Sequence, residues 1–400
     1  MKLSKRISSF QASPIRRLVP FSNEAAEKGI HVYHLNIGQP DIQTPPQVIE
    51  AIRRYDHNII AYGQSEGDKD LRKALPAYYR RYNIEVTEDD IMITTGGSEA
   101  IQFVFMTLCD PGDEVIVPEP YYTNVGSFAK GAGVVLKSVT SSFDDAFRLP
   151  DIGEFESHVN ERTRAIMLCS PNNPTGHVYT EKELHDILQL AKERDIFLIV
   201  DEVYREFCYD GEAFLSALTL TGYQDRIIVV DSFSKRYSMC GARIGTLVTK
   251  NREVLDGVMK LAQARLCPPE IEQIAALAAL QTPSSYLDEV QVEYQKRRDY
   301  LVKRLQTMEG VSCSHPKGAF YLVARLPVDD AEDFCTFLLR DFSYRDETVM
   351  LAPAEGFYVT GGMGKNEVRI AYVLNIDDLE RAMDCLENAL EQYTRRTNSN

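Results

Sequence analysis

Residues 165–201 read AIMLCSPNNPTGHVYTEKELHDILQLAKERDIFLIVD, and this stretch decides the fold. The apolar run at 165–169 predicts a buried strand, which ends at the turn-forming sequence SPNNPTG. Thr180 and Glu183 form a capping box, and the residues that follow place their apolar side chains on one face of a helix. The apolar run at 196–200 then predicts a second strand. A strand, a helix and another strand in this order are typical of a parallel βαβ unit.

The alternation of strands and helices continues on both sides of this unit, from about residue 90 to residue 250. Its strands are nearly continuous apolar runs, which are typical of a sheet that helices cover on both faces. The pattern therefore predicts an α/β fold with a mainly parallel sheet. Further strands of this sheet are predicted at residues 113–117, 134–139, 227–230 and 243–248.

The pattern changes in the last third of the chain. A long charged helical segment leads away from the sheet, and apolar runs at 318–326 and 366–374 predict the strands of a second unit. The N-terminal residues have too little pattern to form a domain alone, so we expect them to join this unit. We predict a large domain at 46–284 and a smaller α/β domain made of 1–45 and 285–400.

The composition narrows the classes of function. The chain has 400 residues and a formal net charge of −15, and so acidic a surface repels the phosphates of nucleic acids. No stretch approaches the roughly 20 apolar residues of a membrane span, and the basic opening leads into no apolar signal region. Eight cysteines occur without a CxxC pair, and seven histidines form no metal-ligand pattern. We expect a cytoplasmic protein that acts on small molecules, without a nucleic-acid, membrane or metal partner.

Polar side chains follow three of the predicted strands at the point where each strand ends. In an open parallel sheet, ligands bind beyond the carboxyl ends of the strands, so these residues are expected to converge on one crevice. They are Asn173 after the first strand, Asp201 and Tyr204 after the second, and Ser232, Ser234 and Lys235 after the third.

This set of side chains suits an aromatic cofactor that carries a ring nitrogen, a phenolic oxygen, a phosphate and an aldehyde, which is pyridoxal phosphate. Lys235 would form a Schiff base with the aldehyde. Asp201 would keep the ring nitrogen protonated, so that the ring withdraws electrons. The hydroxyl groups and the guanidinium of Arg243 would bind the phosphate.

A series of motifs extends this interpretation to nearly the whole chain. In this order they resemble the motifs of the class I/II aminotransferases, the fold-type I pyridoxal-phosphate enzymes related to aspartate aminotransferase. The resemblance implies a large domain with a mainly parallel seven-stranded sheet covered by helices, and a smaller α/β domain built from the two chain ends. The motifs are NIGQPD (36–41), YGQSEGDKDLRKAL (62–75), TTGGSEA (94–100), PEPYY (118–122), SPNNPTG (170–176), DEVYREF (201–207), SFSK (232–235) and VRIAYV (368–373).

The resemblance also implies roles for individual residues. Lys235 would be the lysine of the aldimine, Asp201 the partner of the ring nitrogen, and Tyr204 a donor to the ring oxygen. The other implied cofactor ligands are Gly97, Ser98 and Glu99 at the start of a helix, Tyr122 on the ring face, and Asn173, Ser232 and Arg243. The implied substrate ligands are Gly38, Asn173 and Arg369.

The same resemblance implies a homodimer in which Tyr62 reaches across a two-fold interface to the neighbouring subunit's cofactor phosphate. The implied reaction moves an amino group from an L-amino acid, aspartate-like first of all, to a 2-oxo acid such as 2-oxoglutarate. It would follow a ping-pong course through the Lys235 aldimine. C–S β-lyases and cyclising synthases share these motifs and stay open as alternatives. No basic residue can be assigned from the sequence to a substrate side-chain carboxylate.

The chain departs from the family pattern in two places. Cys240 and Ala242 stand where many members have a threonine and a tryptophan, although the spacing from Lys235 to Arg243 is kept. The segment 356–367 also differs from the usual pattern near the substrate arginine. Neither departure touches the residues expected to hold the phosphate.

The sequence leaves two other classes of function as alternatives. Ser98 lies in GGSEA between a predicted strand and a helix, which resembles the nucleophile elbow of a serine hydrolase with His315 as the late histidine. That interpretation leaves Asn173, Lys235 and Arg243 unexplained. A non-enzymatic regulator that keeps the cofactor fold would need a DNA-binding extension, which the sequence lacks.

Overall fold

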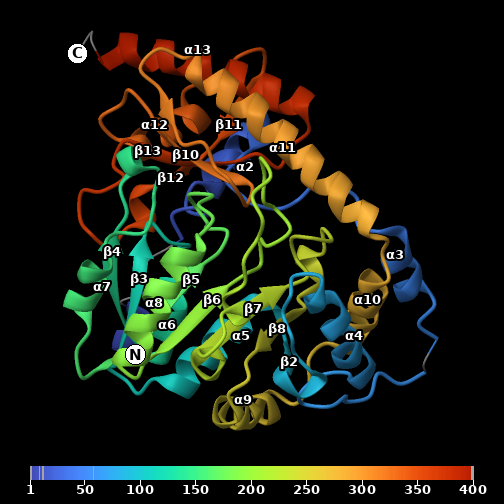
Figure 1. The fold of residues 1–400 in the computed structure, drawn as a ribbon. Coiled ribbons are helices and arrows are strands. Elements are labelled where there is room, and N and C mark those ends of the chain that lie inside the picture. Colours follow the sequence, from blue (N-terminus) through green and yellow to red (C-terminus); the bar gives the residue numbers. More distant parts are fainter. Residues whose placement is uncertain (1, 9, 11–12, 57, 398–400) are drawn as a thin grey trace.

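The computed structural model describes all residues except 1, 9, 11–12, 57 and 398–400. A seven-stranded sheet has the strand order β2-β8-β7-β6-β5-β3-β4 (Figure 1). The pairs from β7 through β6, β5 and β3 to β4 are parallel, and β8 runs antiparallel to both β2 and β7. The predicted α/β fold with a mainly parallel sheet is therefore confirmed. The strands are β2 (Ile91–Thr94), β3 (Glu114–Glu119), β4 (Val135–Thr140), β5 (Thr163–Cys169), β6 (Phe197–Asp201), β7 (Ile227–Ser232) and β8 (Gly245–Val248).

Helices cover both faces of this sheet, and the strands show why. In β5, Ile166 and Leu168 belong to one apolar core, whereas Ala165 and Met167 belong to the other. Both cores exclude water, so the positions 165–169 of β5 are all apolar and form an unbroken apolar run. The helices over these faces are α3 (Pro46–Arg53), α4 (Lys69–Arg80), α5 (Gly96–Leu108), α6 (Asn124–Ala132), α7 (Ile152–His158), α8 (Glu181–Glu193), α9 (Arg252–Arg265) and α10 (Glu270–Leu280).

The predicted βαβ unit is formed by β5, α8 and β6. The Thr180 side chain accepts a hydrogen bond from the Glu183 amide at 3.2 Å, and the Glu183 carboxylate accepts one from the Thr180 amide at 2.8 Å. This capping box starts α8 where the sequence predicts it. The two strands pair in parallel, with Cys169 in register with Asp201. The ends of both strands therefore lie side by side at one edge of the sheet.

A second group of elements packs against this sheet and lies above it in Figure 1. Four strands form an antiparallel sheet in the order β12-β13-β10-β9, and β1 pairs in parallel with β11. Its strands are β1 (His31–His34), β9 (Ser312–Cys313), β10 (Tyr321–Arg325), β11 (Glu347–Met350), β12 (Ala352–Pro353) and β13 (Glu367–Ala371). The remaining helices are α1 (Lys5–Ser8), α2 (Val19–Glu27), α11 (Ser284–Gln306), α12 (Ala331–Arg340) and α13 (Ile376–Thr397).

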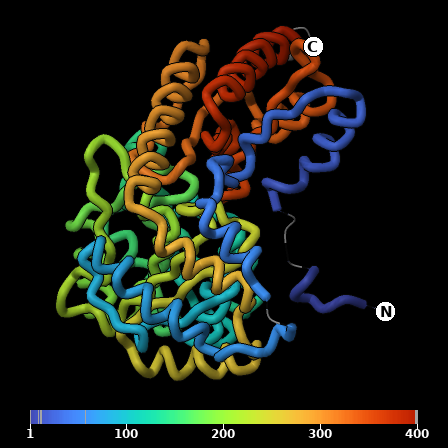
Figure 2. Tube along the Cα trace, turned by 90° about the vertical axis from the view of Figure 1, so that its right-hand side faces the viewer, coloured from blue at the N-terminus to red at the C-terminus, as the bar shows by residue number. Residues whose placement is uncertain are grey.

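N-terminal residues contribute to this second group. Leu18, Val32 and Leu35 are at most 9% exposed and share one apolar core with residues of α11, α12 and α13. Figure 2 shows the blue stretch that follows the first residues beside the red C-terminal helix, whereas the residues at the label N lie apart from it. The two chain ends thus build a common core, while the domain limits predicted at 46–284 stay a prediction.

Within the described ranges, no helix combines the length and the apolar composition that crossing a bilayer requires. The same ranges contain no group of three or more histidine, cysteine, aspartate or glutamate side chains placed to hold a metal ion.

A buried ionic cluster surrounds Asp231, the next-to-last residue of β7. Asp231 is fully buried, with its carboxylate 2.7 Å from Arg236 Nη1 and 3.2 Å from Arg205 Nη1. Arg205 also pairs with Glu202 at 2.8 Å. Burial by itself would raise the pKa of Asp231, but the two arginines outweigh it and hold that pKa below its ordinary value. The cluster stabilises the turn that carries Ser232, because the Ser232 amide donates to Asp231 at 2.7 Å.

We expect Asp231→Ala to lower the free energy of unfolding by about 3 kcal/mol or more, because it leaves buried arginine charge without its partner. The measurement is urea unfolding followed by circular dichroism. Asp145→Ala is the matched control, since it removes an exposed carboxylate 3.5 Å from Arg148 and should change stability by less than about 0.5 kcal/mol. Equal losses in the two variants would contradict a structural role for the cluster.

Candidate active site

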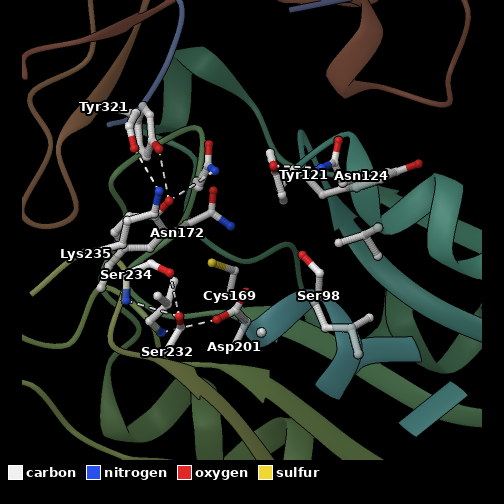
Figure 3. A pocket seen from close by; sticks show the side chains of 18 of the residues that line it. Ser98, Tyr121, Asn124, Cys169, Asn172, Asp201, Ser232, Ser234, Lys235 and Tyr321 are labelled. Atoms are coloured by element: carbon white, nitrogen blue, oxygen red, sulfur yellow. Dashed lines mark hydrogen bonds between the residues drawn. The ribbon is translucent and has the colours of Figure 1, made fainter. Parts of the chain in front are cut away.

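A cavity of about 590 Å³ opens at the carboxyl ends of three central strands (Figure 3). Cys169, Asp201 and Ser232, the last residues of β5, β6 and β7, all line it. In Figure 3, Lys235 and Ser98 lie on opposite sides of the cavity, with Asp201 between them. The predicted site residues that line the cavity are Gly38, Gly97, Ser98, Tyr122, Asn173, Asp201, Tyr204, Ser232, Lys235, Arg243 and Arg369.

Lys235 enters the cavity from the turn after β7. Its Nζ atom donates a hydrogen bond to the Gly38 carbonyl at 2.7 Å and lies 3.7 Å from Cys240 Sγ. Burial lowers the pKa of the Lys235 amine, and the charges of Arg369 and Arg243 act in the same direction. A larger fraction of this amine is therefore neutral at a given pH, which makes it a better nucleophile and base.

Asp201 is a partly buried carboxylate without an ion-pair partner in the described part of the chain. Its Oδ1 atom accepts one hydrogen bond, from the Val203 amide at 3.2 Å. Burial raises the pKa of Asp201 to about 7, although that hydrogen bond and the charge of Lys235 oppose the rise. A cationic group brought to this carboxylate would be stabilised by it, and the protonated nitrogen of a pyridine ring is such a group.

A chain of hydrogen bonds joins two walls of the cavity. Arg369 donates to Asn173 Oδ1 at 3.0 Å and to the Asn36 carbonyl at 2.5 Å. The Asn173 amide nitrogen lies 3.5 Å from the Tyr204 hydroxyl, which is 3.0 Å from the Tyr321 hydroxyl. The Arg369 Nε atom is buried without a partner among the described residues. Arg369 itself lines the cavity, where a guanidinium suits a carboxylate.

A candidate anion site lies where β8 passes the first turn of α5. A Cβ atom at Gly245 would lie 2.5 Å from the Gly96 carbonyl carbon, and one at Gly96 would lie 2.5 Å from Arg243 Nη2. Only glycine permits this approach, which brings the Arg243 guanidinium to the start of the helix. Backbone amides at a helix start and an arginine together suit a phosphate group. Ser98 and Ser232 add hydroxyl groups to the same part of the lining.

Two predicted cofactor ligands do not line the cavity. The Glu99 carboxylate accepts hydrogen bonds from the Thr95 amide and from Arg265 Nη1, both at 2.8 Å. It therefore fastens the first turn of α5 instead of entering the cavity. Tyr62 lies in a loop with its side chain 80% exposed. It is not among the residues that line the cavity of its own chain.

Tyr321 and Arg16 are among the lining residues that the sequence did not single out. Tyr321 begins β10 in the segment GAFY, and only its position at the start of a strand was available from the sequence. Arg16 follows the segment SPI near the N-terminus, where no periodic pattern marks it. The hydrolase alternative gains no support, because His315 is half exposed beside Asp210 and is absent from the lining that contains Ser98.

The donor set fits pyridoxal phosphate. The amine of lowered pKa suits its aldehyde, and the partly buried, unpaired carboxylate suits its ring nitrogen. The amide beside a phenol suits its ring oxygen, and the arginine at a helix start suits its phosphate. The departure at Cys240 leaves this set complete, since its thiol lies beside Lys235 without replacing any member.

Comparisons with known proteins agree with this geometry. The sequence profile described as aminotransferase class I and II matches residues 30–386. A putative aminotransferase, YugH, of Bacillus subtilis is 32% identical over 98% of this chain and 99% of its own length. The aspartate aminotransferase of Thermotoga maritima is 34% identical over 97% of this chain and 99% of its own. The solved alanine aminotransferase of Pyrococcus furiosus superposes with a TM-score of 0.89 at 35% identity, covering 98% of this chain and all of that one.

The lowered pKa of Lys235 can be tested by competitive acylation of the cofactor-free protein across a pH series, read by mass spectrometry. Lys182 is the control, because its hydrogen bond to Asp186 raises the pKa of its amine. Only the neutral amine reacts, so acylation of Lys235 should reach half its maximal rate below pH 10.5 and acylation of Lys182 above it. Coinciding profiles would show that the cavity does not perturb Lys235.

Proposed function

The chain belongs to the class I and II aminotransferases and is a pyridoxal-phosphate-dependent enzyme, and we propose that it moves the amino group of an aspartate-like L-amino acid to 2-oxoglutarate in a ping-pong reaction. The observation that carries the proposal is the convergence of Lys235, Asp201 and Arg369 on one cavity. Aspartate aminotransferases among the relatives support the choice of donor. The proposed compartment is the cytoplasm, which eight cysteines without a CxxC pair favour.

The proposed chemistry assigns the proton transfers to two residues. When bound, pyridoxal phosphate supplies an aldehyde that takes up the amino group and a ring that withdraws electrons from the substrate Cα. Lys235 would hold the cofactor in the resting enzyme and, once the substrate amine has replaced it, move the proton at Cα. Its lowered pKa suits that role, because it increases the neutral fraction of the released amine. Asp201 would hold the proton of the ring nitrogen.

The remaining residues would orient the reactants. Arg369 would bind the substrate α-carboxylate, with Asn173 fixing the guanidinium plane and the Gly38 backbone beside it. Asn173 and Tyr204 would also face the ring oxygen, and Tyr122 would lie against the ring. Phosphate would be held at the start of α5 by Ser98 and the amide of Gly97, together with Ser232 and Arg243. Glu99 would act indirectly, because its carboxylate accepts a hydrogen bond from the Thr95 amide and so stabilises that turn.

The proposal is tested by separating the two half-reactions. Cofactor-loaded enzyme given L-aspartate without any oxo acid should release one oxaloacetate per active site, and 2-oxoglutarate added afterwards should yield one glutamate. Lys235→Ala should slow the first half-reaction by about 10³-fold, because the proton at Cα then lacks its base. Lys182→Ala removes an exposed lysine and should leave the rate unchanged.

Other outcomes separate the alternatives. Steady release of ammonia and pyruvate from an S-substituted cysteine, without a half-reaction on aspartate, would favour the β-lyase alternative. Rapid half-reactions with alanine or phenylalanine and none with aspartate would keep the aminotransferase but reject the proposed donor.

We also propose a homodimer in which Tyr62 completes the partner's phosphate site. Its 80% exposure and its absence from the cavity of its own chain support a role across an interface. A C₂ dimer uses the same patch twice, so one tyrosine would serve each of the two sites.

Hybrid dimers show whether Tyr62 acts within its own subunit or across the interface. Tyr62→Ala and Lys235→Ala proteins, each nearly inactive, are unfolded and refolded together. A tyrosine that acts across the interface leaves one intact site in each hybrid, so about a quarter of wild-type activity should return in an equal mixture, half of whose dimers are hybrids. Verified hybrids without activity would show that Tyr62 acts within its own subunit.

A further inference from the structure

Arg16 is a basic residue in the lining of the active-site cavity, and it has no role in the proposed reaction. The lining contains four basic side chains, Arg16, Lys235, Arg243 and Arg369, and one carboxylate, that of Asp201. Lys235 carries the cofactor, Arg243 suits its phosphate, and Arg369 suits the substrate α-carboxylate. Binding of the cofactor, and of the α-amino and α-carboxylate groups that all amino acids share, therefore does not require Arg16.

The guanidinium of Arg16 has no hydrogen-bond or ion-pair partner in the part of the chain that the structure describes. Its neighbour Arg17 differs, because Arg17 forms an ion pair with Glu332 and does not line the cavity. Two successive arginines thus have different surroundings. Both residues are exposed, but Arg17 is paired with Glu332, whereas Arg16 lines the cavity without a partner among the described residues.

The backbone that carries Arg16 is fixed to the same wall as Arg369. Ile15 is 8% exposed and packs with Ala354 and Phe357. The Ile15 carbonyl accepts a hydrogen bond from Asn36 at 3.3 Å, and the backbone carbonyl of Asn36 also accepts from Arg369. The ring of Phe357 lies 5.0 Å from the Arg369 guanidinium. Arg16 is therefore tied to the α-carboxylate site by short chains of contacts.

The charges of both arginines act on one aromatic residue of the cavity. Burial raises the pKa of the Tyr122 phenol, and the positive charges of Arg369 and Arg16 oppose that rise. Tyr122 lines the cavity, where its hydroxyl accepts a hydrogen bond from Asn124 at 2.8 Å. A substrate bound against Tyr122 would thus lie in the field of two guanidinium groups.

We propose that Arg16 binds the side-chain carboxylate of a dicarboxylic amino acid or 2-oxo acid whose α-carboxylate is bound by Arg369. This assignment rests on the proposed function and names the residue that selects its substrate class. A carboxylate gains charge-assisted hydrogen bonds from a free guanidinium. An aromatic or aliphatic side chain would instead take water from Arg16 without replacing its hydrogen bonds.

The test is calorimetric binding of two unreactive carboxylates to the cofactor-loaded enzyme. Maleate carries two carboxylates, whereas 3-phenylpropionate carries one. Arg16→Leu should weaken maleate about tenfold or more and change 3-phenylpropionate by less than about twofold. Arg16→Lys keeps the charge and should recover part of the loss. Arg17→Leu is the matched control and should leave both affinities unchanged, because Arg17 is paired with Glu332.

Equal weakening of both ligands by Arg16→Leu, or no weakening of either, would overturn the assignment. So would an aspartate half-reaction in Arg16→Leu with an unchanged kcat/KM. In both cases, completion of the two half-reactions by the wild-type enzyme would still support the proposed aminotransferase activity. A wild-type enzyme that binds neither carboxylate and reacts with no amino acid would overturn both proposals.

Discussion

The parallel pairing of β5, β6 and β7 is the constraint on which the active site depends. It places Cys169 in register with Asp201, and Asp201 in register with Val230. Segments that are distant in the sequence therefore end at one edge of the sheet. The residues after these ends, such as Asn173 and Lys235, enter one cavity because parallel strands all direct their carboxyl ends the same way.

Two aspartates at this edge show how the surroundings divide structural from chemical roles. Burial acts on both and by itself would raise both pKa values. Two arginines reverse the effect at Asp231, so this carboxylate stays charged and supports the turn behind the site. Asp201 has no such partner among the described residues, and its pKa rises to about 7. The structural carboxylate, Asp231, thus has arginine partners, whereas the carboxylate that would face the cofactor, Asp201, has none among the described residues.

Much of the site could be predicted from the sequence, because strand ends can be located from apolar runs and the chemistry from the residues that follow them. Asp201 and Lys235 were predicted in this way, and both line the cavity. Tyr321 was not, because its contact with Tyr204 joins residues 117 positions apart, and neither residue type nor spacing indicates that contact. Glu99 follows Ser98 directly, but successive residues of a helix point in different directions, and the Glu99 side chain contacts Arg265 instead of the cavity.

The sequence alone determined the order of strands and helices, the class of cofactor and the family, because apolar periodicity and motif spacing are local properties of the chain. Tertiary packing decided which cations face the substrate. Arg16 and Arg17 are the same residue type at successive positions, and no local rule distinguishes them. Ile15 packs against Phe357, and Arg17 pairs with Glu332, 315 positions along the chain, which leaves Arg16 to the cavity. Contacts between residues so distant in the sequence form only when the whole chain folds, so only the folded chain assigns the two arginines.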